Sequence, residues 1–82
     1  MNLHLVTPSS TQNYTIQWLE VVTPQGDLVI QPGHAPIILV LVSNKKMTFM
    51  LDTGEEKIVR LTRSGFLEVQ RAKIMALLNQ EQ

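Results

Sequence analysis

The side chains of this 82-residue chain that could do chemistry are few and widely spaced. Its two histidines, His4 and His34, each lack a second metal-ligating residue two or four positions away. A zinc site needs three or four convergent ligands, and the chain has no cysteine, so we predict no bound metal. For His34 two interpretations stay open. Its ring either stabilises a corner of the chain by hydrogen bonding or contacts a partner, since loop residues beside a rigid turn are often functional.

The patterns that catalysis or nucleotide binding would need are missing as well. The adjacent acidic pair Glu55-Glu56 lies at a predicted hairpin tip, which favours solvated carboxylates over an acid–base pair. No serine lies in a Gly-x-Ser-x-Gly elbow, and no Gly-x-x-x-x-Gly-Lys-Ser/Thr phosphate loop is present. We therefore expect a chain that is not an enzyme by itself and that needs no cofactor.

The composition predicts one small globular domain. The chain is 44% hydrophobic and 17% charged, which supplies one core and too few charges for a disordered tail. Seven basic and seven acidic residues give no net charge, so we expect no binding to nucleic acid, which needs a clustered basic face. The longest apolar run, residues 37–42, is far short of the ~20 residues that span a bilayer. We expect a soluble chain that meets a membrane only through a partner.

Short β-forming segments between turn signals make up most of the chain. Apolar and polar residues alternate over residues 14–18 and 47–51, as in strands with one buried face. The phase slips after Trp18, which predicts a β-bulge near Trp18-Leu19. Turn signals every eight to twelve residues are typical of an all-β sandwich or barrel. The other strands are expected at residues 3–7, 28–31, 37–42, 57–61 and 66–69.

The last segment, residues 72–82, gives conflicting signals. It is rich in good helix formers, but an isolated helix of this length is marginal. Ile74, Ala76 and Leu78 alternate as a final strand would. We predict a strand here, a domain over residues 1–78, and a frayed tail over residues 79–82.

A stiff corner stands between two of the predicted strands. Pro32 has a fixed φ and Gly33 accepts a positive φ, so the pair predicts a type II turn. Pro36 restricts the residue before it to extended conformations. We expect Pro32, Gly33 and Pro36 to be structural turn residues. From these patterns alone, the chain is a non-enzymatic β-sandwich, and an interaction module.

Two motifs resemble a known family, the epsilon subunit of the F-type ATP synthase. The first motif in that family reads Gly-Glu/Asp-Leu/Phe-Gly-Ile-Leu-Pro-Gly-His-Ala-Pro, and the second reads Gly-Gly-Phe-Leu-Glu-Val. Val29, Gln31 and Ser64 depart from these patterns, which indicates a divergent member. The corresponding stretches here are Gly26-Asp27-Leu28-Val29-Ile30-Gln31-Pro32-Gly33-His34-Ala35-Pro36 and Ser64-Gly65-Phe66-Leu67-Glu68-Val69.

The resemblance implies a flattened antiparallel β-sandwich of two sheets, with about eight to ten short strands. It also implies a non-catalytic central-stalk subunit that couples ion-driven rotation to ATP synthesis or hydrolysis, peripheral to the cytoplasmic face of the membrane. Most bacterial members continue into a regulatory helical hairpin, and the four residues after Leu78 lead us to expect that it is absent. The alternative is a β-sandwich interaction module unrelated to the rotary machine.

The family's functional positions can be transferred to matching residues of this chain. The partners implied are the gamma subunit and the c-ring. The contacts expected with the c-ring are Gly26, Asp27 and Leu28. The contacts expected with gamma are Thr7, His34, Leu39, Arg63, Ser64 and Glu68.

Overall fold

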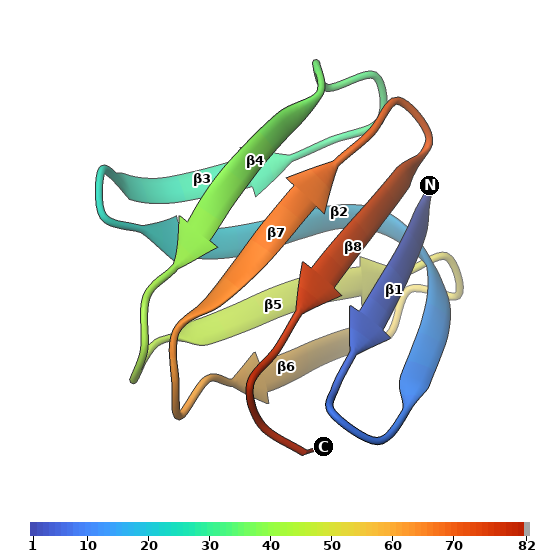
Figure 1. Ribbon diagram of the computed structural model, residues 1–82. Coiled ribbons are helices and arrows are strands. Elements are labelled where there is room, and N and C mark those ends of the chain that lie inside the picture. The colour runs from blue at the N-terminus through green and yellow to red at the C-terminus, as the bar shows by residue number, and fades with distance from the viewer. Residues whose placement is uncertain (82) are drawn as a thin grey trace.

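The computed structural model describes residues 1–81, which form eight strands and contain no helix (Figure 1). The all-β prediction and the expected number of strands are therefore confirmed. Since no helix is present in residues 1–81, this part of the chain has no helix able to cross a membrane. The strands are β1 (Asn2–Val6), β2 (Thr11–Thr23), β3 (Gly26–Ile30), β4 (Ile37–Leu41), β5 (Lys46–Leu51), β6 (Glu56–Arg60), β7 (Gly65–Val69) and β8 (Lys73–Leu77).

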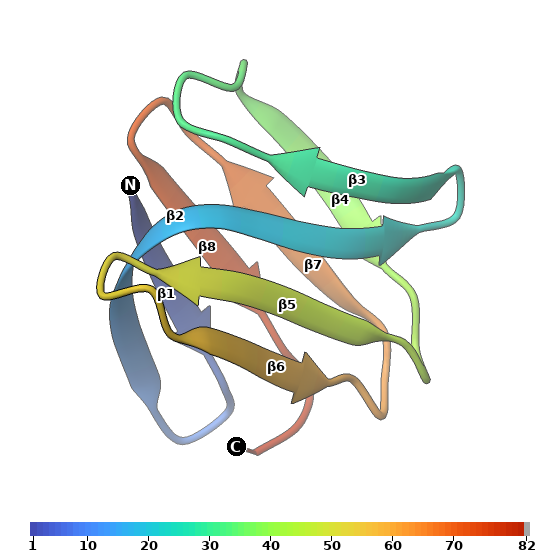
Figure 2. The ribbon, with the colours of Figure 1, turned by 180° about the vertical axis from the view of Figure 1, so that it is seen from behind.

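One long strand joins two layers. The hydrogen-bonded order is β4-β7-β8-β1-β2-β5-β6, and β3 also pairs with β2. The 13-residue β2 pairs with β1 through its first half and with β3 and β5 through its second half. A first layer (β4, β7, β8 and β1) therefore faces a second layer (β3, β2, β5 and β6), as Figures 1 and 2 show from opposite sides. The layers belong to one curled sheet, and not to two separate flat sheets.

The strand directions correct one expectation. β1 and β8 run parallel, with Asn2 opposite Lys73 and Val6 opposite Leu77, whereas the other paired strands are antiparallel. The prediction of a fully antiparallel sandwich is therefore wrong at this pair. A short hairpin forces antiparallel pairing, but β1 and β8 come from opposite ends of the chain, so no hairpin sets their direction.

Two local predictions are confirmed. The register of β2 against β5 shifts between Ile16 and Trp18, close to the predicted bulge. The last segment forms the strand β8, which pairs with β1 on one side and β7 on the other. Ile74 and Ala76 are fully buried there. Burial between two strands thus overrides the helix propensity of this segment.

The core lies between the two layers and is filled by the inward-facing side chain of every second residue. The Phe49 ring packs against Tyr14 with 5.1 Å between ring centroids and a 51° tilt. The buried apolar residues are Leu3, Leu5, Ile16, Leu19, Val21, Ile30, Leu41, Met47, Phe49, Val59, Leu61, Leu67, Val69, Ile74, Ala76 and Leu78.

The corner between β3 and β4 is the predicted turn. Gly33 has a φ of 86°, and the His34 amide donates to the Gln31 carbonyl at 3.1 Å. A positive φ at the third residue, after Pro32 at the second, defines a type II turn. The turn prediction is therefore confirmed.

Residues 79–81, part of the expected tail, follow the last strand and form side-chain hydrogen bonds with the domain. The side-chain amide nitrogen of Asn79 donates to the Ser64 backbone carbonyl at 3.0 Å. The side-chain amide nitrogen of Gln80 donates to the Arg60 backbone carbonyl at 2.8 Å. The Gln80 side-chain oxygen accepts from the Thr62 amide at 2.7 Å. The rest of the expected tail, residue 82, lies outside the described residues.

Candidate interaction site

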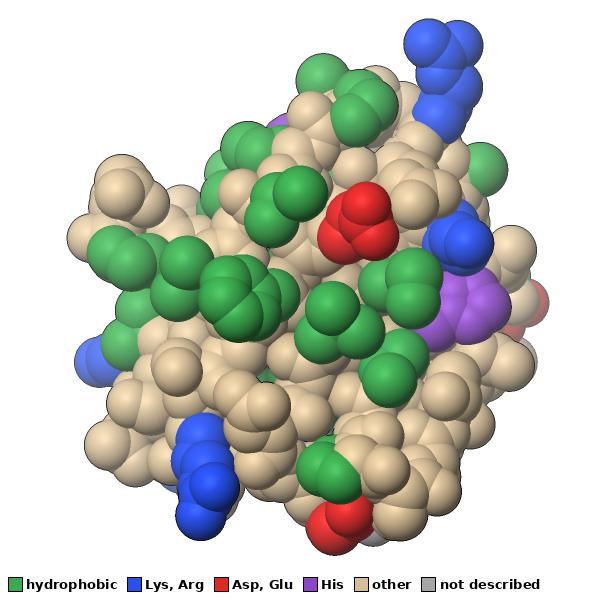
Figure 3. Space-filling view, in the orientation of Figure 1, with side chains coloured by type: hydrophobic (Ala, Val, Ile, Leu, Met, Phe, Trp, Pro, Cys, Tyr) green, Lys and Arg blue, Asp and Glu red, His purple; other side chains and the backbone are tan. Residues whose placement is uncertain are grey.

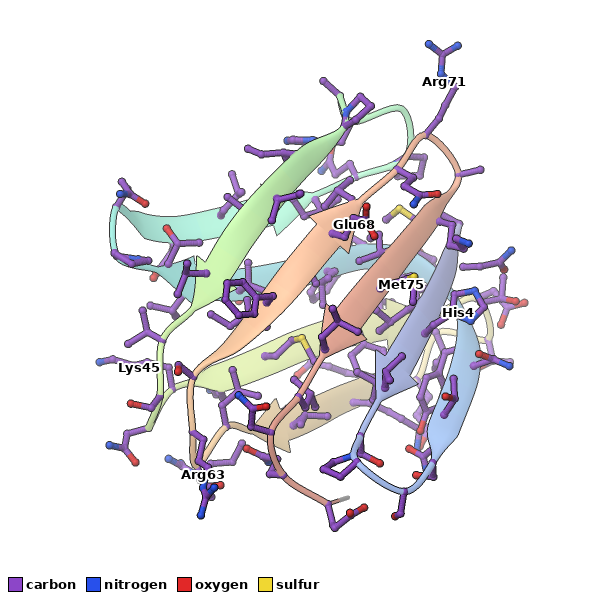
Figure 4. The ribbon with its side chains drawn as sticks, in the orientation of Figure 1. His4, Lys45, Arg63, Glu68, Arg71 and Met75 are labelled. Atoms are coloured by element: carbon purple, nitrogen blue, oxygen red, sulfur yellow. The ribbon has the colours of Figure 1, made fainter. Side chains whose placement is uncertain are left out.

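Two rows of outward-facing side chains cross β4, β7 and β8 in the first layer. Within each row the residues are direct cross-strand partners, as the strand register requires. We call these six side chains the apolar face (Figures 3 and 4): Val40, Phe66 and Leu77 in the first row, and Ile38, Glu68 and Met75 in the second.

The apolar side chains of this face are contiguous and well exposed, and contiguity distinguishes them from a single exposed side chain such as Ile58. Ile38 is 70% exposed, Phe66 is 51% exposed, and Val40 and Leu77 are 45% and 40% exposed. Contiguous apolar patches rimmed by polar residues mark interaction sites, whereas scattered ones are normal. Figure 3 shows hydrophobic side chains over these strands around one carboxylate, which Figure 4 identifies as Glu68. The arrangement therefore suits binding to the apolar surface of another protein.

Strand alternation explains how the face arises. Successive side chains point to opposite sides of a strand, so Leu39 and Leu67 face the core while their neighbours face outward. A strand that is apolar on both sides is typical of one whose second side is also covered. The signal for this face was the six-residue apolar run over residues 37–42, from which only a strand was predicted. The contacts predicted from the sequence therefore do not include Ile38, Val40, Phe66, Met75 and Leu77.

Of the residues expected to contact gamma, Glu68 lies within the apolar face. It is half-buried between its partners Ile38 and Met75. Leu39 is half-buried against the core and faces inward. The side chains presented to a partner by β4 are therefore those of Ile38 and Val40.

The other expected gamma contacts lie at two opposite ends of the first layer. His34 is in the corner before β4, where its Nδ1 lies 2.7 Å from the Ala35 carbonyl oxygen. That contact suits the interpretation of His34 as a ring that stabilises the corner. Arg63 and Ser64 are in the loop before β7, and antiparallel pairing puts the start of β7 at the far end of β4.

Thr7, which follows β1, is also buried rather than presented to a partner. Its side chain is 7% exposed, and its hydroxyl lies 2.9 Å from the Ser10 hydroxyl. The structure therefore does not bring His34 together with Thr7, Arg63 and Ser64.

The residues expected to contact the c-ring form the turn between β2 and β3. Gly26 and Asp27 are exposed, and Leu28 is half-buried against the core. Gly26 has a φ of 120°, and its carbonyl accepts a hydrogen bond from the Thr23 hydroxyl at 3.0 Å. Asp27 forms no ion pair within residues 1–81. It lies at the end of β3 opposite the corner, so the structure separates it from His34.

Neither histidine is placed for chemistry. His4 flanks the apolar face beside Met75, and its Nδ1 lies 2.5 Å from the Asn13 side-chain oxygen (Figure 4). Residues 1–81 hold no group of three metal-ligating side chains. The fold and the apolar face together define an all-β domain with a contiguous exposed apolar surface.

Comparison with known proteins gives the family. Residues 1–80 match the family model described as ATP synthase, Delta/Epsilon chain, beta-sandwich domain, and the chain belongs to this family. The resemblance drawn from the two motifs is therefore confirmed. The epsilon chain of ATP synthase is a non-catalytic subunit, which agrees with the expectation that this chain is not an enzyme by itself.

Two curated relatives are epsilon chains of ATP synthase. The chain is 40% identical over 55 residues to that of Corynebacterium jeikeium strain K411. It is 33% identical over 55 residues to that of Corynebacterium diphtheriae. Each match covers 67% of this chain and 44% of the relative, so the chain spans less than half of these relatives.

Two solved structures share the fold. A chain of the Euglena gracilis mitochondrial ATP synthase, in an OSCP/F1/c-ring structure, superimposes with a TM-score of 0.82 and 13% identity, over 95% of this chain and 49% of that chain. A chain from the central stalk and c-ring structure of the Tetrahymena thermophila mitochondrial ATP synthase superimposes with a TM-score of 0.76 and 16% sequence identity. The match covers 98% of this chain and 63% of that chain. At such identities the likeness shows the fold alone.

Proposed function

We propose that this chain acts in the central stalk of an F-type ATP synthase, where its apolar face binds the gamma subunit. The observation that carries the proposal is the contiguous exposed apolar face in a chain of the epsilon family. Permanent subunit interfaces are more apolar than the rest of a protein surface, and resemble a core cut in half. The chain meets the membrane only through the complex, at its cytoplasmic face.

A coupling subunit needs a second contact surface that is free while the first is occupied. We propose that the turn carrying Asp27 rests on the polar loops of the c-ring. This turn lies in the second layer, whereas the apolar face covers the first, so both partners can bind at once. The chain then has no chemical step of its own and transmits ion-driven rotation as a rigid body, since β2 runs through both layers.

The test of gamma binding is calorimetry with the gamma subunit from the same source. We expect tight binding by the unaltered chain and loss of at least tenfold in affinity for Phe66→Asp, because the carboxylate would be desolvated at the interface. Ile58→Asp is the matched control, since Ile58 is 56% exposed but lies on β6 in the second layer. Absence of binding at micromolar concentration would contradict the proposal and favour an interaction module unrelated to the rotary machine.

The c-ring contact needs a separate measurement. We expect Asp27→Lys to leave binding to isolated gamma unchanged and to weaken attachment to a gamma–c-ring subcomplex in a pull-down. Equal attachment of Asp27→Lys and the unaltered chain would show that this turn is not the contact.

A further inference from the structure

A shallow pocket of about 240 Å³ opens on the outer face of the second layer, away from the apolar face. It is lined by Trp18, Glu20, Val29 and Gln31. Trp18 and Glu20 are two positions apart on β2 and therefore point to the same side. Val29 is the cross-strand partner of Glu20 on β3, and Gln31 follows the end of that strand. Adjacent strands thus bring an indole, a carboxylate, an aliphatic side chain and an amide together.

The carboxylate in this pocket has no counter-ion in the described chain. Glu20 is exposed and forms no ion pair within residues 1–81. Its partner on β5 is Thr48, and its partner on β3 is Val29, so no cation stands directly opposite it. A ligand that enters the pocket meets one unpaired negative charge beside one aromatic ring.

We propose that this pocket binds the guanidinium group of an arginine side chain presented by a protein partner. A guanidinium stacks on an indole face by a cation–π interaction. It also donates two parallel hydrogen bonds to a carboxylate. Val29, which is 44% exposed, packs against the aliphatic stem of the arginine. A lysine ammonium fits less well because it is compact, more strongly hydrated and unable to stack.

The only tryptophan of the chain reports on this pocket directly. The test is titration of the chain with N-acetyl-arginine amide, followed by the single indole N–H signal in an NMR spectrum. We expect a saturable shift in the millimolar range, and little shift with the uncharged isostere N-acetyl-citrulline amide. Equal shifts with the two compounds, or no saturation with the arginine compound, would overturn the proposal.

Two variants locate the binding. We expect Glu20→Gln to weaken binding of the arginine compound about two- to fivefold, the effect of one exposed ion pair. Asp52→Asn removes a charge in the turn after β5 and should leave the affinity unchanged. Unchanged affinity in Glu20→Gln, with the other amide signals in place, would contradict the role of Glu20. The measurement uses this chain alone, so its outcome is independent of whether gamma binds.

Discussion

Glu68 lies directly opposite Ile38 across the β4–β7 pair, so the carboxylate of the apolar face stands beside its most exposed aliphatic side chain. Covering this pair with a partner gains the transfer of Ile38 from water, worth about 1.5–3 kcal/mol for a fully buried side chain. It also desolvates Glu68, which is costly unless the partner supplies a hydrogen-bond donor or a cation. The face therefore favours a partner that is apolar with one polar group opposite Glu68.

This relationship predicts that binding and stability change in opposite directions in Ile38→Lys. The lysine gains a cross-strand ion pair with Glu68, which should raise the free energy of unfolding by about 0.2–1 kcal/mol. It also puts a hydrated cation in the interface, so we expect affinity for gamma to fall at least tenfold. Chemical denaturation and calorimetry measure the two effects.

Ile58→Lys is the control, because Ile58 faces Thr48 and lies in the second layer. Ile58→Lys should change neither the free energy of unfolding nor the affinity for gamma appreciably. Gamma affinity that is equal in Ile38→Lys and the unaltered chain would show that gamma does not cover this part of the face.

The strands and turns could be predicted from local sequence patterns, because covalent geometry sets those patterns. The Pro32-Gly33 turn and the alternation of residues 14–18 depend on φ preferences and on the two-residue period of a strand. The parallel pairing of β1 with β8 depends on contacts between the chain ends, which no local pattern encodes. The apolar face had one local signal, the apolar run over residues 37–42, but its extension onto β7 depends on register, since Phe66 and Val40 are distant in sequence and meet only through strand pairing.

A like-charge pair in the second layer concerns stability alone. Lys46 and Arg60 are exposed cross-strand partners on β5 and β6, an unfavourable arrangement of cations. We expect Lys46→Glu to stabilise the domain by about 0.2–1 kcal/mol and the gain to shrink at high salt. Lys45→Glu is the control, because Lys45 lies in the turn before β5. An equal gain from both variants would indicate a general charge effect instead of the pair.

Gly65 begins β7 at a point of close approach to β8. A Cβ added there would lie 2.6 Å from the Leu77 carbonyl oxygen, so backbone would have to move. We expect Gly65→Ala to cost about 1–3 kcal/mol, as overpacking does. The measurement is the denaturant midpoint at unchanged m-value. Ser64→Ala, one residue earlier and exposed, should stay within about 0.5 kcal/mol of the unaltered chain.

Leu39 and Val40 are neighbours on β4 that face opposite sides, so their variants should affect stability and binding differently. Leu39 is half-buried against the core, so we expect Leu39→Ala to lower the free energy of unfolding by about 1–3 kcal/mol, less than full burial would cost. Val40 is 45% exposed in the apolar face, so Val40→Ala should cost less than about 0.5 kcal/mol.

For the affinity for gamma, we expect Val40→Ala to have the larger effect of the two variants. Because Val40 and not Leu39 is presented outward, Val40→Ala should lower the affinity of the folded chain several-fold, and Leu39→Ala should leave it nearly unchanged. The measurement is calorimetry below the unfolding transition of both variants, with circular dichroism to establish the folded fraction. Loss of affinity in Leu39→Ala alone would mean that gamma contacts the edge of β4, and not its outer face.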